Sequence, residues 1–238
     1  RIRIFYKDIF RLPSFNDLYY GETGNNKLKP ENARQYNIGL TYSKDVCPFL
    51  PYLSATVDAY YNKITDKIIA YPTKNLAVWS MRNLGSVEIK GIDVTGNVSL
   101  QPCEKFRINL SGNYTYQRAL DVTNSDPASE EGRTYKHQIA YTPRVSSSGQ
   151  VGIETFWVNL SYSFLLSGKR YAVGQNIAAN RLDSYSDHSI SASRDFRIKK
   201  VTTSLSVEIL NIMNKNYEIV KSFPMPGRSV RATFSVRY

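Results

Sequence analysis

The sequence predicts an all-β protein whose strands run up and down as the wall of a membrane barrel. Apolar and polar side chains alternate along about ten segments, and this period of two indicates strands with one apolar face. The connections alternate between long, about 15 to 22 residues, and short, about 4 to 7 residues, as in barrels with long extracellular loops and short periplasmic turns. No stretch approaches the roughly 18 apolar residues of a membrane helix, whereas a spanning strand needs only about 9 to 11 alternating residues.

The C-terminal stretch, 201–238, shows the alternation most clearly. Apolar side chains point one way in its last strand, and small, polar or cationic side chains point the other. The apolar set is Val230, Ala232, Phe234, Val236 and Tyr238. In a water-soluble sandwich this face would be a core, and in an outer-membrane barrel it would contact lipid.

The first half of the chain contains five expected strands. They cover about 2–10, 33–43, 53–64, 85–100 and 106–117. Long polar segments are expected at about 11–32, 65–83 and 118–135. The apolar phase of the fourth strand changes between Ile89 and Ile92, which predicts a β-bulge at Lys90 or Gly91.

The second half contains the other five expected strands. The sixth covers about 136–150, although Pro143 weakens it, and a tight turn is expected near Gly152. The seventh contains Val158 to Phe164, the eighth covers about 184–195, and the final pair covers 201–209 and 230–238. Because long and short connections alternate, the last strand follows a long loop and runs towards the end with the short turns. This predicts a periplasmic C-terminus.

The composition is basic and rich in tyrosine, with a formal charge of +11 and 18 Tyr against 10 Phe and 2 Trp. Tyrosine suits a membrane interface, and positive charge fits acidic lipid headgroups or an anionic ligand. The basic residues are scattered singly along the strands, so no nucleic-acid partner is expected. No cofactor is expected either.

The histidines and cysteines have no metal-ligand spacing, so no metal site is predicted. Cys47 and Cys103 fall in two predicted periplasmic turns. Two strand spacings, roughly 10 Å, separate these turns, which is too far for a disulfide unless the turns lean together. The sequence leaves that pairing open.

Two other classes of membrane barrel remain open at this stage. Ten strands are an even number, so a complete small barrel is possible. Such a barrel would be an outer-membrane protease, for which His137 beside Asp121 or Asp126 is the candidate, or it would be a passive porin. The chain begins inside a strand pattern without a signal peptide, which predicts the C-terminal part of a longer protein.

Several motifs resemble those of TonB-dependent outer-membrane receptors. The stretch from Phe10 to Tyr20 followed by Leu28-Lys-Pro-Glu resembles a mid-barrel signature, and Leu210 to Tyr217 followed by Pro224 to Arg228 resembles a C-terminal signature. The motif residues are Arg11, Pro13, Leu28, Pro30, Glu31, Gly91, Asn211, Asn214, Pro226, Gly227, Arg228 and Tyr238.

This resemblance implies a 22-stranded barrel, of which 1–238 would be the C-terminal part, around a plug that these residues do not include. It implies an outer-membrane receptor for a ferric siderophore or cobalamin, with long loops outside and short turns in the periplasm. The implied partners are membrane lipid and lipopolysaccharide, a small-molecule or metal-chelate ligand, and the TonB–ExbB–ExbD system acting through the plug.

Aromatic and cationic side chains in the long loops are the candidate ligand contacts, because they would form a mouth for an anionic or aromatic ligand. The candidates are Tyr19, Tyr20, Tyr71, Trp79, Arg82, Arg170, Tyr171 and Arg181. The alternative is that most of these side chains lie at the membrane interface or contact lipopolysaccharide.

Overall fold

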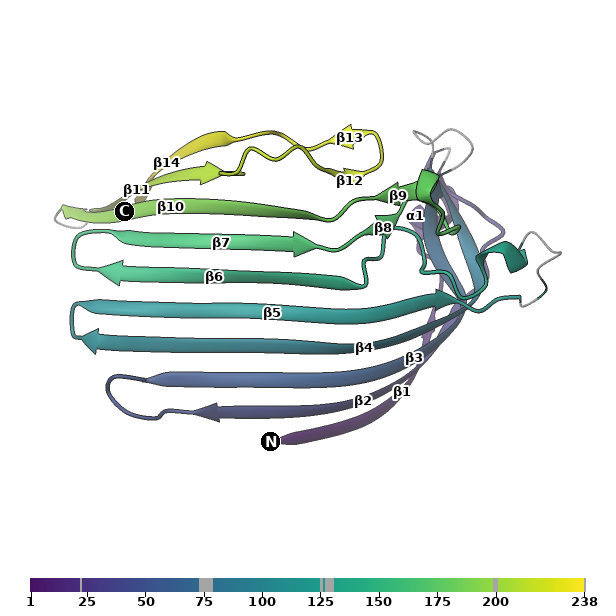
Figure 1. Cartoon of the computed structure of the whole chain (residues 1–238), viewed down its shortest axis with the longest axis horizontal. Helices are drawn as coiled ribbons and strands as arrows, with labels where there is room; N and C mark the ends of the chain where they lie inside the picture. Colours follow the sequence, from purple (N-terminus) through teal and green to yellow (C-terminus); the bar gives the residue numbers. More distant parts are fainter. Residues whose placement is uncertain (22, 73–78, 125, 127–130, 199–200, 238) are drawn as a thin grey trace.

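The computed structural model describes residues 1–21, 23–72, 79–124, 126, 131–198 and 201–237. Ten strands form one antiparallel sheet in the order β1-β2-β3-β4-β5-β6-β7-β10-β11-β14 (Figure 1). The strands are β1 (Ile2–Arg11), β2 (Glu31–Lys44), β3 (Tyr52–Pro72), β4 (Trp79–Cys103), β5 (Phe106–Asp121), β6 (Val145–Thr155), β7 (Asn159–Ser167), β10 (Tyr185–Ile198), β11 (Val201–Leu210) and β14 (Ser229–Arg237). The predicted all-β, up-and-down arrangement is confirmed.

The remaining elements lie in the long connections, towards one end of the sheet (Figure 1). They are the helix α1 (Phe15–Tyr19), the 3₁₀ turns η1 (Glu131–Thr134) and η2 (Ala178–Asn180), and the two small hairpins β8 (Arg170–Tyr171) with β9 (Arg181–Leu182) and β12 (Glu218–Val220) with β13 (Phe223–Pro224). In the part of the chain that is described, no helix has the length and apolar character to cross a membrane.

The sheet has two faces of opposite character, which we call the apolar face and the polar face. On β2 the side chains of Tyr36, Ile38 and Leu40 are about half exposed, whereas Ala33 and Gly39, on the other face, are buried. The polar face carries ion pairs between strands, such as Arg3 of β1 with Asp58 of β3 at 2.9 Å. This division is what the alternation in the sequence predicts.

A small apolar core interrupts the polar face close to the long connections. It consists of Ala33, Ile64, Val87, Ala119 and Ile139, with Leu84 and Ile89 packed against it. Residues 131–144, which we call the strap, contribute Ile139 and pair with β5 through the bond from the Ile139 N–H to the Ala119 carbonyl at 2.9 Å. Val87 is fully buried there.

The predicted β-bulge at Lys90 or Gly91 is wrong. The registers of β4 with β3 and with β5 run through these two residues without a shift. Val87 and Ile89 therefore lie on the polar face. The apolar side chains of β4 change from one face to the other because the small apolar core covers the polar face at this point. The irregularity in β4 lies between Leu100 and Cys103 instead.

The predicted start of the sixth strand is also wrong. Strand β6 begins at Val145, because 136–144 belongs to the strap, where Lys136 and Tyr141 have positive φ and Pro143 lacks an N–H. The following turn lies at Thr155 to Val158, closed by a hydrogen bond from Thr155 N–H to the Val158 carbonyl, and not near Gly152.

The expected loop at 65–83 is shorter than predicted. Strands β3 and β4 stay paired as far as Pro72 with Trp79. The outer part of this hairpin keeps its strand pairing although its apolar and polar side chains do not alternate regularly. The alternation therefore marks only part of these strands and does not mark their ends.

The two cysteines lie at the end with short turns. Both are exposed free thiols, Cys47 in the turn between β2 and β3 and Cys103 at the end of β4. The pairing that the sequence leaves open is therefore absent between these two described residues.

Candidate ligand-binding mouth

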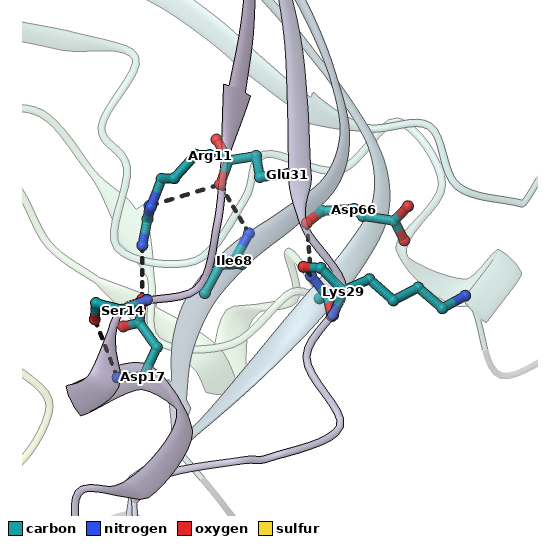
Figure 2. A network of polar contacts seen from close by, with 8 residues as sticks. Arg11, Ser14, Asp17, Lys29, Glu31, Asp66 and Ile68 are labelled. Atoms are coloured by element: carbon teal, nitrogen blue, oxygen red, sulfur yellow. Dashed lines mark hydrogen bonds and ion pairs between the residues drawn. The ribbon is translucent and has the colours of Figure 1, made fainter.

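A polar clamp holds the base of the first long connection (Figure 2). The Arg11 guanidinium lies 2.9 Å from the Asp17 carboxylate and 3.6 Å from that of Glu31. The Glu31 carboxylate also accepts a hydrogen bond from the Ile68 N–H of β3 at 3.0 Å. Arg11 therefore joins the end of β1, helix α1 and the start of β2, which explains a motif containing Arg11 and Glu31.

Helix α1 begins at a capping box. The Ser14 hydroxyl accepts from the Asp17 N–H, and the Asp17 carboxylate accepts from the Ser14 N–H. The bond from the Ser14 N–H is the main reason that the pKa of Asp17 is lowered, with the Ser14 hydroxyl and Arg11 adding to it against the opposing effect of burial. Asp17 is thus held as a carboxylate.

Asn83 fixes the other side of this connection. Its side-chain oxygen accepts from the Lys29 N–H at 2.8 Å, and its amide donates to the carbonyls of Lys29 and Asp66. These contacts hold the Leu28-to-Glu31 motif, which includes Pro30, against the β3–β4 hairpin. Figure 2 shows Lys29 of this motif beside Asp66 of β3. The Leu28-to-Glu31 motif therefore has a structural role, because it fixes the end of the first long connection to the β3–β4 hairpin.

A pocket of about 520 Å³ lies between the β4 end, the strap and the β8–β9 connection. Arg82 of β4 and Arg133 of the strap line it, together with Asn83, Gln138 and Gln175. Asp121 also lines the pocket, and its carboxylate accepts hydrogen bonds from the hydroxyls of Thr123 and Thr134. The two guanidinium groups suit an anionic ligand group. The sequence-based candidates include Arg82 but not Arg133, because one arginine in a polar loop carries no distinguishing pattern.

Aromatic residues lie close to this pocket in the chain without lining it, and Tyr141 directly follows Ala140 of its lining. The Trp79 and Tyr141 rings are 5.4 Å apart and tilted, and the Tyr141 N–H donates to the Tyr171 carbonyl at 2.8 Å. Burial raises the pKa of Tyr141. The structure thus brings Trp79, Arg82 and Tyr171 into one region. The sequence does not single out Tyr141, because its neighbours place it in an expected strand.

Arg170 does not lie as expected for a ligand contact. Its side chain is buried, its residue 3% exposed, and it donates to the carbonyls of Asp183, Glu218 and Ile219. Burial lowers the pKa of Arg170, and its guanidinium also lies 5.0 Å from the centre of the Tyr185 ring. Arg170 therefore links two loops through their carbonyl groups and is buried, in contrast to the exposed position expected for a ligand contact.

Tyr185 and Tyr217 extend this tie. Their rings are stacked, 4.3 Å apart at 8°, and the Tyr217 hydroxyl donates to Asp187 at 2.7 Å. Burial and this carboxylate raise the pKa of Tyr217. The stack fixes the last long connection against β10.

A second pocket, of about 720 Å³, lies beside this stack. Its lining includes Arg181, Lys215 and Lys221. Arg181 is exposed and pairs with Asp183 at 3.0 Å. Arg181 therefore lies apart from the Trp79 and Arg82 group, in a second cationic region.

The other candidates lie elsewhere. Tyr19 and Tyr20 are exposed on the first connection, and Tyr19 packs 5.1 Å from the Phe15 ring. Neither lines the two pockets described above. The Tyr71 side chain is outside the described residues.

The C-terminal motif closes the last long connection. The Asn211 side chain is buried, accepts from the Lys215 N–H and donates to the Lys215 and Pro226 carbonyls. Asn214 accepts from the Arg228 N–H at 2.9 Å, and a Cβ at Gly227 would lie 2.9 Å from the same Asn214 oxygen. Tyr238 lies outside the described residues.

Two further motif residues have local roles. At Gly91, a Cβ would lie 2.4 Å from the Tyr60 hydroxyl, so only glycine lets this ring cross β4. Pro13 precedes the capping box of α1 and is half-buried. Gly91 therefore has a structural role in the sheet, and Pro13 has one at the start of α1.

The histidine considered for a protease does not form an acid–base pair with Asp121. The Asp121 carboxylate accepts from the hydroxyls of Thr123 and Thr134, and His137 Nδ1 accepts from the Asn176 N–H at 3.2 Å. Among the described residues, no group of three or more His, Cys, Asp or Glu side chains could hold a metal ion.

Comparisons with known proteins agree with this arrangement. A family model described as "TonB dependent receptor-like, beta-barrel" matches residues 1–212. The Vitamin B12 transporter BtuB of Photobacterium profundum is 26% identical over 235 residues, which is 96% of this chain and 34% of that protein.

Two solved structures share the fold. The Copper transporter OprC has a TM-score of 0.66 and 16% identity, over 97% of this chain and 36% of that chain. A ferric enterobactin receptor (PfeA) from Pseudomonas aeruginosa, solved in complex with enterobactin, has a TM-score of 0.64 and 17% identity, over 99% of this chain and 38% of that chain. The chain thus spans about a third of the length of these proteins.

Proposed function

The chain belongs to the TonB-dependent receptor family, and from this premise we propose that its full-length protein takes up a scarce ligand, cobalamin or a ferric siderophore, across the outer membrane. The family consists of receptors and transporters, which favours uptake over the protease and the passive porin. The name of the BtuB relative supports cobalamin, and the enterobactin receptor supports a siderophore.

The observation that carries this proposal is the two-faced sheet with its long connections at one end. Its apolar face suits lipid, and its polar face suits the wet interior of a wide barrel. In this orientation the long connections are extracellular, and the short turns and the C-terminus are periplasmic. Ten strands would then be part of a 22-stranded wall, with the plug and the TonB–ExbB–ExbD contact supplied from outside 1–238.

The ligand contacts that we propose are concentrated at the pocket beside the strap. Arg82 and Arg133 would bind an anionic group, such as a corrinoid phosphate or a siderophore carboxylate, and Trp79 with Tyr141 would pack against its apolar part. The proposed contacts of the wider mouth are Arg181, Tyr171, Tyr19, Tyr20 and Tyr71.

A binding experiment on the full-length protein tests this proposal. Calorimetry with cyanocobalamin, haem and a panel of ferric siderophores should identify one ligand class. The double variant Trp79→Ala, Arg82→Ala should then bind it at least about tenfold more weakly, because a charge-assisted hydrogen bond alone contributes roughly 1.5–3 kcal/mol.

The matched control removes the same residue types at the opposite end of the wall. Trp157 and Arg107 are exposed beside the short turns, so Trp157→Ala, Arg107→Ala should bind like the parent. Equal affinity of both double variants would exclude the pocket beside the strap. Uptake that persists in cells lacking TonB would contradict energised transport.

A further inference from the structure

Gln138 is a buried polar residue of the strap, 3% exposed. Its N–H donates to the Asn176 side-chain oxygen at 2.6 Å, and its carbonyl accepts from the Asn176 amide at 2.9 Å. Its Oε1 accepts from the Ala119 N–H at 3.2 Å. These three bonds fix Gln138 between β5 and the β8–β9 connection.

The side-chain nitrogen of Gln138, Nε2, is buried and has no hydrogen-bond partner among the described residues. The Ala119 N–H is a donor, so the oxygen of the amide must face it and the nitrogen cannot take its place. Buried polar groups are nearly always paired, because an unmade hydrogen bond destabilises the fold. Nε2 therefore lacks an acceptor that a ligand can supply.

Gln138 lines the pocket beside the strap, together with Arg82 and Arg133. The carboxylate of Asp121 also lies in this lining, and both of its oxygens accept hydrogen bonds from threonine hydroxyls. The lining thus combines two guanidinium groups and an unpaired amide donor with a carboxylate that is already hydrogen-bonded. This excess of donors favours a ligand oxygen that carries negative charge.

We propose that Gln138 is a specificity-determining residue of this pocket, and that its Nε2 donates a hydrogen bond to a carboxylate or phosphate oxygen of the ligand. The bonds to Asn176 and Ala119 hold the side chain in place before the ligand arrives, which lowers the entropic cost of the contact. The donor is closed to solvent in this structure, so the bond requires a small shift of the lining around it. This inference rests on the proposed function, because it names a contact of the same ligand site.

Gln138→Glu tests the donor, because it keeps an oxygen for the Ala119 N–H and removes the N–H groups of the amide. The probes are cyanocobalamin, which carries a phosphodiester, and a ferric carboxylate siderophore. Calorimetry on the full-length protein should show that Gln138→Glu binds whichever probe the parent binds at least about tenfold more weakly.

Gln175→Glu is the matched comparison, because it places the same charge in the lining of the same pocket. Gln175 is only partly buried, so solvent and salt screen this charge, and the variant should weaken binding by less than about threefold. The comparison separates the missing donor from the added charge.

Inorganic phosphate and acetate test the contact without the transported ligand. Compared with chloride at equal ionic strength, millimolar phosphate or acetate should slow hydrogen–deuterium exchange of 131–144 in the parent and not in Gln138→Glu. The anion with the larger effect identifies a phosphate or a carboxylate as the preferred group. If Gln138→Glu speeds exchange of the strap without added anion, Gln138→Met, which removes the donor without adding charge, takes its place in both measurements.

Three results would overturn this role of Gln138. These are equal binding by the parent and the Gln138 variant, an equal loss in Gln175→Glu, and equal slowing of strap exchange by the anions in parent and variant. A parent whose strap is protected by phosphate or acetate but that takes up no ligand contradicts the proposed transport alone. Normal uptake without any anion effect on the strap contradicts the Gln138 contact alone.

Discussion

Asp17 shows how a single side chain orders a long connection. Its carboxylate accepts from the Ser14 N–H at the start of α1 and pairs with Arg11 at the end of β1. Burial would favour the neutral acid, but these contacts outweigh it, so the pKa is lowered. A lowered folded-state pKa stabilises the fold above the unfolded pKa, and this contribution is lost as the pH falls through the folded value.

We expect residues 12–30 to lose order below about pH 4, where an unfolded aspartate titrates. Hydrogen–deuterium exchange of peptides covering 12–30, corrected for intrinsic exchange, should rise as the pH falls from 5 to 3. Asp17→Asn should already exchange faster at pH 7, with a loss of about 1 kcal/mol in local stability, and should show a weaker pH dependence. Asp45→Asn, at an exposed carboxylate in a short turn, serves as the control and should exchange like the parent.

The candidate residues show where sequence reasoning ends at this scale. Residue types make Trp79 and Arg82 candidates, and both lie near the start of β4, but residue types do not distinguish Arg170 from Arg181. Both are arginines in the same polar connection, yet one is buried against three carbonyls and the other is exposed. Side-chain burial in a loop depends on distant contacts that local composition does not encode.

The strap is the element that the sequence analysis predicts wrongly. Apolar and polar side chains do not alternate regularly at Gln138, Ile139 and Ala140. The strap nevertheless pairs with β5 through hydrogen bonds from the Asp121 N–H to the His137 carbonyl and from the Ile139 N–H to the Ala119 carbonyl. The sequence analysis therefore assigns 136–144 to the sixth strand, because this part of the strap directly precedes β6 and pairs with β5 as a strand would. The membrane-spanning strands are predictable, because lipid and water on opposite faces impose a period of two.

Ile139→Ala tests the strap. Removing a buried isoleucine should cost about 2–4 kcal/mol of local stability by cavity formation, because Ile139 packs on Val87 and Ala119. Hydrogen exchange of 131–144 should accelerate while that of β11 stays unchanged. Ile177→Ala, at a residue that is 50% exposed, should have little effect. Equal protection of the strap in both variants would show that the cluster does not hold it.

The whole molecule is organised by one sheet with two environments. The register from β1 to β5 keeps each apolar row on one side, so the apolar face is continuous across these strands. The number of strands and their up-and-down order follow from sequence, since they depend only on alternation and connection length. The apolar core on the polar face does not follow, because it requires the strap to cover it.

Ile38→Lys tests the lipid assignment of the apolar face. Ile38 lies between Tyr36 and Tyr42, so a charge there should destabilise folding into bilayers by about 2–4 kcal/mol. Gln117→Lys, on the polar face, should cost less than about 1 kcal/mol. Urea titration of the full-length protein in lipid vesicles measures both. Similar small losses would mean that the apolar face does not contact lipid.

The complete burial of Val87 has a consequence for solute passage. Residues 131–144 cover the apolar cluster on β3, β4 and β5, so a ligand on the polar side would meet the strap there and not these strands. Moving the strap aside would expose Val87 and its apolar neighbours to water. In the uptake that we propose, the ligand therefore passes along another part of the wall.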